Sequence, residues 1–366
     1  MKLISQIKLM PTEEQQTFLK DTIQQANAAC NIISNFAWDN KQFRKHALQK
    51  SIYHQTKGDT GLSAQVIIRC ISRVADAYKI DKKTKRKFKP LSAITFDNRI
   101  LSWRVNKSQV SIWTIGGRQR ILFVCGERQR KLLESRQGET GLILRRGKFY
   151  LFATCNAEEP KPDDVGGVLG VDLGIVNIAT DSDGQVHSGS QVKNVRHRHR
   201  RLRTKLQKKN TKSAKRLLKK LSGKEARFAK DVNHTIAKKI VVKAKGTRRG
   251  IALENLKGIR TRVTARRQQR ATLSSWSFFQ LRQFIEYKAR LAGVPVSAVN
   301  PRNTSRACPS CWHIDKKNRP NQSTFLCVRC GFAGLADSIA ADNIRRVAVN
   351  QPYADKLSAR SASPRL

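Results

Sequence analysis

Residues 308–337 read CPSCWHIDKKNRPNQSTFLCVRCGFAGLAD, and this segment decides the fold of the C-terminal half. It contains two Cys-x-x-Cys pairs separated by 15 residues. That spacing predicts a zinc ribbon, in which each pair donates two thiolate sulfurs to one tetrahedral ion. The expected ligands are Cys308, Cys311, Cys327 and Cys330. Because four protein ligands leave no open coordination position, we expect one structural Zn²⁺.

An acidic residue, Asp337, opens the alanine-rich, helix-like segment that follows the ribbon. Two further acids end apolar runs with the pattern of buried strands: Asp172 ends VLGVD, and Glu254 ends IALE. A carboxylate in such a place is costly unless it is paired or binds a metal. Two strand acids and one helix acid predict an RNase H-like α/β domain with two Mg²⁺ or Mn²⁺ ions.

Each acid also has a simpler interpretation, as a helix cap or a salt-bridge partner in a very basic chain. Four other acids are interpreted as solvated loop residues: Asp163, Asp164, Asp181 and Asp183. Asp342 could compete with Asp337, but five residues turn it about 140° around a helix, onto another face. The strand and ribbon contexts favour the three-carboxylate interpretation for Asp172, Glu254 and Asp337.

The formal net charge is +47, from 73 Lys and Arg against 26 Asp and Glu. A charge of this size repels itself without an anionic partner and favours nucleic acid. Residues 193–224 hold 15 Lys or Arg and no acid, although a charge run is more often a solvated helix face. The candidate contacts are Arg198, Arg200, Arg201, Lys205, Lys208, Arg260, Arg266 and Arg267.

The pattern of the N-terminal half predicts a small antiparallel β-barrel, wedge-like, formed by residues 1–11 and 85–160. A helical domain, 12–84, is expected as an insertion after the first strand, since its apolar residues recur at helical spacing. Pro160-Lys161-Pro162 is interpreted as a linker. The nuclease-like domain then comprises 165–302 and 334–349.

The ribbon is expected over 303–333, and a helix is expected from Trp276 to Ala292. The Ser/Arg/Pro-rich tail, 350–366, is expected to be disordered. No apolar run reaches the roughly 18 residues of a membrane helix, and no signal peptide is expected. The remaining cysteines are scattered singly, which indicates buried core residues and a reducing, cytoplasmic setting.

Several segments resemble the TnpB (OrfB) proteins of insertion sequences, which are relatives of compact type V CRISPR effectors. They are GVDLGIVNIAT, LENLKG, SSWSFFQLRQFIEYKARLAGVPVSAVNPRNTSRACPSC, FLCVRCG and ADSIAADNI. The resemblance implies a RuvC nuclease domain whose acids are Asp172, Glu254 and Asp337. It also implies the four zinc cysteines named above.

The resemblance further implies an RNA-guided DNA endonuclease of a prokaryotic cytoplasm, associated with the nucleoid. Its partners would be a structured guide RNA and double-stranded target DNA beside a short flanking motif, with no membrane partner; a monomer is favoured. Two alternatives stay open: a nuclease-inactive RNA-guided repressor, and a transposase that acts without RNA.

Two positions depart from the family pattern. Trp312 follows the second cysteine where the family usually has Gly, which indicates strain in the first knuckle. Ile339 stands where members commonly carry an Asn, two residues after the third acid. Neither departure removes an expected metal ligand.

Overall fold

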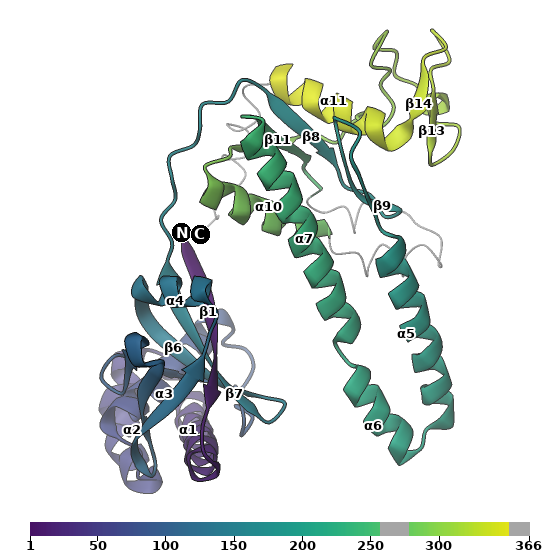
Figure 1. Ribbon diagram of the computed structural model, residues 1–366. Helices are drawn as coiled ribbons and strands as arrows, with labels where there is room; N and C mark the ends of the chain where they lie inside the picture. Colours follow the sequence, from purple (N-terminus) through teal and green to yellow (C-terminus); the bar gives the residue numbers. More distant parts are fainter. Residues whose placement is uncertain (257–277, 351–366) are drawn as a thin grey trace. The chain divides into compact units, whose positions relative to one another are not determined.

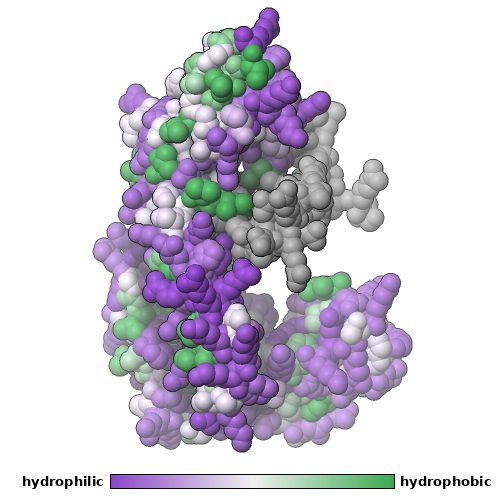
Figure 2. Space-filling model, turned by 90° about the vertical axis from the view of Figure 1, so that its right-hand side faces the viewer, coloured by the Kyte–Doolittle hydropathy of each residue, from purple (hydrophilic) through white to green (hydrophobic). Residues whose placement is uncertain are grey.

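The computed structural model describes residues 1–256 and 278–350, except the side chains of Phe278 and Asn350. The chain divides into two compact units, Met1–Glu158 and Glu159–Leu366. Figure 1 shows the elements of each unit. In the described ranges, no helix is long and apolar enough to cross a membrane. Figure 2 shows a mostly hydrophilic surface on the face in view, with hydrophobic residues in small groups.

The first unit is built on a seven-stranded antiparallel sheet of order β2-β6-β7-β1-β5-β4-β3. The strands are β1 (Lys2–Met10), β2 (Ile94–Phe96), β3 (Leu101–Arg104), β4 (Gln109–Thr114), β5 (Gly117–Val124), β6 (Arg136–Arg145) and β7 (Lys148–Asn156). Side chains alternate between core and solvent: in β1, Ile7 and Leu9 are buried, whereas Gln6 and Met10 are exposed. The sheet forms a nearly closed barrel, which confirms the predicted antiparallel barrel.

Three helices lie between β1 and β2 in the chain: α1 (Glu13–Asp39), α2 (Lys45–Thr60) and α3 (Ala64–Ile80). The first helix begins at a capping box, because the Thr12 hydroxyl accepts from the Gln15 amide while the Gln15 side chain accepts from the Thr12 amide. The three helices thus follow the first strand of the sheet and precede its second strand in the chain. A 3₁₀ turn, η1 (Val105–Lys107), and α4 (Glu127–Glu134) complete the unit.

The second unit contains a five-stranded mixed sheet of order β10-β9-β8-β11-β12. Its strands are β8 (Val168–Asp172), β9 (Asn177–Asp181), β10 (Val186–Ser188), β11 (Gly250–Glu254) and β12 (Val296–Val299). Strand β11 pairs in parallel with β8 and β12, while β9 is antiparallel to β8 and β10. Carboxyl ends of β8 and β11 therefore meet at one edge.

Alternating side chains of the sheet pack against different helices. Leu169, Val171 and Leu253 join the core formed with α7 (Lys224–Gly246) and α10 (Phe278–Ala292). Gly170 and Ala252 instead approach α11 (Ala336–Asn350). Because successive strand residues point to opposite faces, the strand-end acids lie on the side of α11.

Helices α5 (Ser190–Lys209) and α6 (Lys212–Leu221) precede α7, and α6 and α7 return alongside α5 (Figure 1). Glu225 of α7 pairs with Arg196 at 3.1 Å and Arg203 at 3.0 Å on α5. Between β12 and α11 lie a 3₁₀ turn, η2 (Lys316–Asn318), and the hairpin β13 (Thr324–Leu326) and β14 (Ala333–Leu335). The predicted start of α10 at Trp276 lies outside the described residues, as do residues 351–366 of the predicted tail, whereas Asn350 is the last residue of α11.

Candidate functional site

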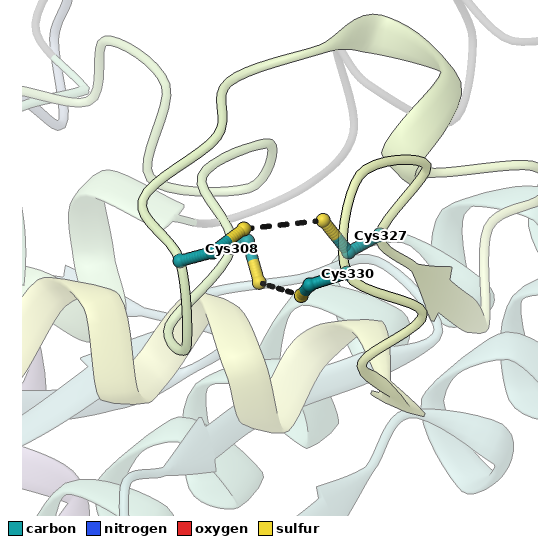
Figure 3. A group of neighbouring side chains, drawn as sticks. Cys308, Cys327 and Cys330 are labelled. Atoms are coloured by element: carbon teal, nitrogen blue, oxygen red, sulfur yellow. Dashed lines mark hydrogen bonds between the residues drawn. The ribbon is translucent and has the colours of Figure 1, made fainter.

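The four ribbon cysteines converge on one point (Figure 3). All four sulfur atoms lie within 4.8 Å of one another. The Cys308–Cys330 and Cys311–Cys327 sulfur pairs are each 3.6 Å apart. A tetrahedral Zn²⁺ with Zn–S bonds of about 2.3 Å requires sulfur separations of roughly 3.8 Å. The donor set and its spacing therefore fit the predicted zinc ribbon.

The two knuckles of the ribbon have the same backbone turn. Trp312 has φ +58° and Gly331 has φ +74°. Their amides donate to the carbonyls of Cys308 and Cys327, each at 3.0 Å. The left-handed conformation costs a non-glycine residue about 1–2 kcal/mol, so the predicted strain at Trp312 is present. The indole is half exposed and lies 5.7 Å from the Arg346 guanidinium.

The three predicted acids line one cavity of about 420 Å³. Asp172 ends β8, Glu254 ends β11, and Asp337 lies in the first turn of α11. The structure thus brings together side chains that are up to 165 residues apart in sequence. Asn255, Thr304 and Arg319 line the same cavity.

The electrostatics of this cavity disfavour three bare carboxylates. Burial, followed by the charges of Glu254 and Asp337, raises the pKa of Asp172 to about 7. Burial also raises the pKa of Glu254, against the opposing effects of the Thr304 hydrogen bond and the Arg319 charge. A cluster of hard carboxylate oxygens suits divalent cations such as Mg²⁺ or Mn²⁺.

Two residues that the sequence reasoning missed contact Asp337. The Asn177 Nδ2 atom of β9 donates to one carboxylate oxygen at 2.9 Å. The Arg319 guanidinium, from the ribbon, donates to the other at 3.3 Å. Asn177 lies five residues after Asp172, on the next strand of the β8–β9 hairpin, which is a weak sign that the two lie close together. Nothing in the sequence distinguishes Arg319 from the other Lys and Arg residues of the ribbon.

Glu254 also has two partners that the sequence did not identify. The Thr304 hydroxyl donates to its Oε1 atom at 2.5 Å. Arg282 of α10 donates to its main-chain carbonyl at 3.2 Å and pairs with Glu286 at 2.7 Å. These contacts hold both the end of β11 and the carboxylate that it carries.

Ile339, the second departure from the family pattern, faces the ribbon rather than the cavity. It packs with Cys308, Phe325 and Cys327 in a small hydrophobic core. A polar side chain here would lose this burial, so the apolar residue joins α11 to the ribbon.

The interpretation as a solvated loop acid is wrong for Asp181, whereas Asp183 is an exposed turn residue, as expected, although it is ion-paired. Asp181 is only 1% exposed and receives a hydrogen bond from the Lys243 ammonium at 2.6 Å. Asp183 is bound in a bidentate manner by Arg249, at 2.8 and 2.6 Å, and this contact lowers the pKa of its carboxyl. The sequence could not reveal that the end of α7 packs against this turn.

Asp342 does not compete with Asp337. Its carboxylate pairs with Arg345 at 2.6 Å and Arg346 at 2.7 Å, away from the cavity. The prediction from helical rotation is confirmed.

The basic candidates on α5 are all exposed: Arg198, Arg200, Arg201, Lys205 and Lys208. Arg260, Arg266 and Arg267 lie outside the described residues. The charge on α5 therefore lies at the surface, where a polyanion could reach it.

Two family models match the chain. Residues 152–257 match OrfB_IS605, described as a probable transposase, and residues 278–344 match the TNB domain of Cas12f1-like proteins. TnpB-like protein MJ0751 of Methanocaldococcus jannaschii is 32% identical over 196 residues, which are 50% of this chain and 69% of the relative. The chain belongs to the TnpB family.

Other curated relatives are RNA-guided or CRISPR-associated nucleases by name. Cas12f1 of Sulfoacidibacillus thermotolerans is 31% identical over 238 residues, covering 59% of this chain and 53% of the relative. The putative RNA-guided DNA endonuclease InsQ of Escherichia coli is 28% identical over 219 residues, covering 54% and 53%. This TnpB-family chain thus spans about half the length of these two relatives.

Two solved structures share the fold. A Cas12f1–sgRNA–target DNA complex has a TM-score of 0.55 at 17% identity, covering 89% of this chain and 82% of the other. The RNA-guided endonuclease CRISPR-Cas_phi3 has a TM-score of 0.60 at 12% identity, covering 95% and 92%. These likenesses show a Cas12-like mixed α/β fold for this TnpB-family protein.

Proposed function

We propose that the protein is an RNA-guided DNA endonuclease of a transposable element, which cuts double-stranded DNA by phosphodiester hydrolysis at one RuvC-like site. The observation that carries this proposal is the convergence of Asp172, Glu254 and Asp337 in one cavity. Relatives named as RNA-guided or CRISPR-associated DNA endonucleases support it.

The three carboxylates are the residues that would hold two divalent ions. When bound, such ions supply an activated water and stabilise the leaving oxygen of the phosphodiester. The chain's own groups orient the ligands: Asn177 and Arg319 hold the Asp337 carboxylate, and Thr304 holds Glu254. Arg319 also brings a positive charge to the rim of an acidic cavity that must admit a phosphate.

In this proposal the nuclease domain comprises 165–302 and 334–349, and the ribbon, 303–333, is a structural Zn²⁺ domain. The barrel of 1–11 and 85–160 and the helical domain of 12–84 bind nucleic acid. The ribbon supplies no catalytic metal because its four cysteines leave no open coordination position.

The partners in this proposal are a guide RNA and a target duplex with a short flanking motif. Base pairing would read the sequence, while the protein would hold backbones through cations such as those of α5. A net charge of +47 supports a large phosphate interface.

The proposal is tested by purifying the protein with its bound RNA, sequencing that RNA, and incubating the complex with a matching plasmid. We expect cleavage with Mg²⁺, none with EDTA, and a loss of at least about a hundredfold for Asp172→Ala. Asp342→Ala, which removes an acid of α11 outside the cavity, should still cut. Absence of RNA would refute the guided mechanism, and bound RNA without Mg²⁺-dependent cutting would indicate a repressor. Strand transfer without RNA would indicate a transposase.

A further inference from the structure

The Glu254 carboxylate is held in place by a residue outside its own sheet. Among the described residues, its side-chain hydrogen-bond partner is the Thr304 hydroxyl, which donates to Oε1 at 2.5 Å. Thr304 is only 3% exposed, so solvent does not replace this contact. Its hydroxyl also lies 3.0 Å from the Pro301 carbonyl, which anchors the side chain to the loop that follows β12.

The Thr304 main chain is in turn held by α11. The Asn343 Nδ2 atom donates to the carbonyls of Thr304 and Ala307, each at 2.8 Å. Asn343 is 1% exposed, and in the described part of the chain its Oδ1 atom has no hydrogen-bond partner. The amide cannot be reversed, because Oδ1 would then face two carbonyl oxygens. The loop is therefore fixed in one position relative to α11.

One helix thus controls two acids. Helix α11 carries Asp337 directly, and six residues later it carries Asn343, which holds the loop that holds Glu254. The same loop leads into Cys308, so the contact lies where the sheet, the ribbon and α11 meet. We propose that Thr304 is a positioning residue for Glu254, fixed by Asn343, and that this chain of hydrogen bonds sets the spacing of the second and third carboxylates.

This inference rests on the proposed divalent-metal site but can be tested without cleavage. The substitutions are Thr304→Val, which keeps the shape and removes the hydroxyl, and Thr304→Ser, which restores the hydroxyl. Mn²⁺ binding to the full-length protein is followed by electron paramagnetic resonance, with Asp172→Ala to identify the site. Loss of a group that orients a metal ligand weakens metal binding by about 10–100-fold.

We expect Thr304→Val to weaken Mn²⁺ binding at least about tenfold, and Thr304→Ser to restore most of it. Zinc content and the thermal unfolding midpoint should stay near wild type in both variants. Wild-type Mn²⁺ affinity in the Thr304→Val variant, or the same loss of affinity in the Ser and Val variants, would overturn the assignment.

Asn343→Leu tests the second half of the chain of contacts. If Asn343 acts through Thr304, the Thr304→Val/Asn343→Leu double variant should have an Mn²⁺ affinity no lower than that of the single variant with the lower affinity. Additive losses would show that Asn343 acts independently and would refute the relay. Wild-type protein that binds Mn²⁺ at the Asp172 site but cuts no DNA would refute only the proposed function. The Mn²⁺ affinities of the wild type and the Thr304 variants could still be compared.

Discussion

The close approach of α11 to β8 at Gly170 makes the sharpest prediction about the site. A Cβ atom at this position would lie 2.1 Å from the Ala341 carbonyl oxygen and 2.6 Å from the Arg345 amide nitrogen. Both neighbours are backbone atoms of the helix that carries Asp337, and Gly170 lies two residues before Asp172. Gly170→Ala therefore forces apart the two elements that bring these acids together.

The size of the effect follows from the geometry. Real Cβ atoms essentially never come within 3.0 Å of such an atom, so β8 and α11 must separate here by at least 3.0 − 2.1 = 0.9 Å. A displacement of about 1 Å in a catalytic arrangement costs roughly a hundredfold in rate. Overpacking at such a contact costs about 1–3 kcal/mol of stability.

The assay compares single-turnover cleavage rates of the RNA-loaded wild type and Gly170→Ala, with thermal unfolding measured on the same samples. Gly166→Ala is the matched control, because its Cβ would meet no atom within 4 Å and its backbone needs no left-handed conformation. We expect a loss of about a hundredfold for Gly170→Ala and little change for the control. A folded Gly170→Ala protein that cuts at the wild-type rate would refute the reasoning.

Three further predictions concern the acid cluster and the cysteine cluster. Because the pKa of Asp172 is raised to about 7, the metal-free folded state keeps a proton that the unfolded state releases near pH 4. The free energy of unfolding should therefore fall by up to about 4 kcal/mol as the pH rises from about 4 to 7. Asp172→Asn should flatten this pH dependence in EDTA, and the same dependence of the melting temperature on pH in both proteins would contradict the prediction. Cys327→Ser should reduce zinc to well below one ion per chain by elemental analysis, whereas Cys125→Ser should not, and normal zinc in the first variant would disprove the ligand assignment. Trp312→Gly should relieve the left-handed strain and stabilise the ribbon by about 1 kcal/mol in thermal unfolding. Gly331→Ala should destabilise the ribbon by a similar amount. A lower unfolding midpoint for Trp312→Gly would contradict this and show that the indole contact with Arg346 outweighs the strain.

The sequence predicted the elements whose signals are local. Cysteine spacing identified the ribbon, and the apolar runs before Asp172 and Glu254 identified two strands, because burial on both faces leaves a continuous hydrophobic pattern. The helix after the ribbon then selected Asp337. These three acids are brought together in the structure as expected.

The contacts that orient the acids could not be predicted, because they join residues far apart in the chain. Thr304 and Glu254 are 50 residues apart, and Asn177 and Asp337 are 160 apart. Asp181 was misinterpreted for the same reason, since Lys243 lies 62 residues away. A polar residue in a turn carries no local sign of a distant partner.

The ribbon lies within the 36-residue connection, 300–335, between β12 and α11. A chain segment of that length would have to give up much conformational freedom to deliver α11 to the sheet. A Zn²⁺ ion bound to the four cysteines would fix residues 308–330, so that only the flanking segments 300–307 and 331–335 remain as flexible loop. The saving in loop-closure entropy is about 1 kcal/mol. The metal ion would thus shorten the connection that has to close, so that Asp337 reaches the strand-end acids with a smaller loss of chain entropy.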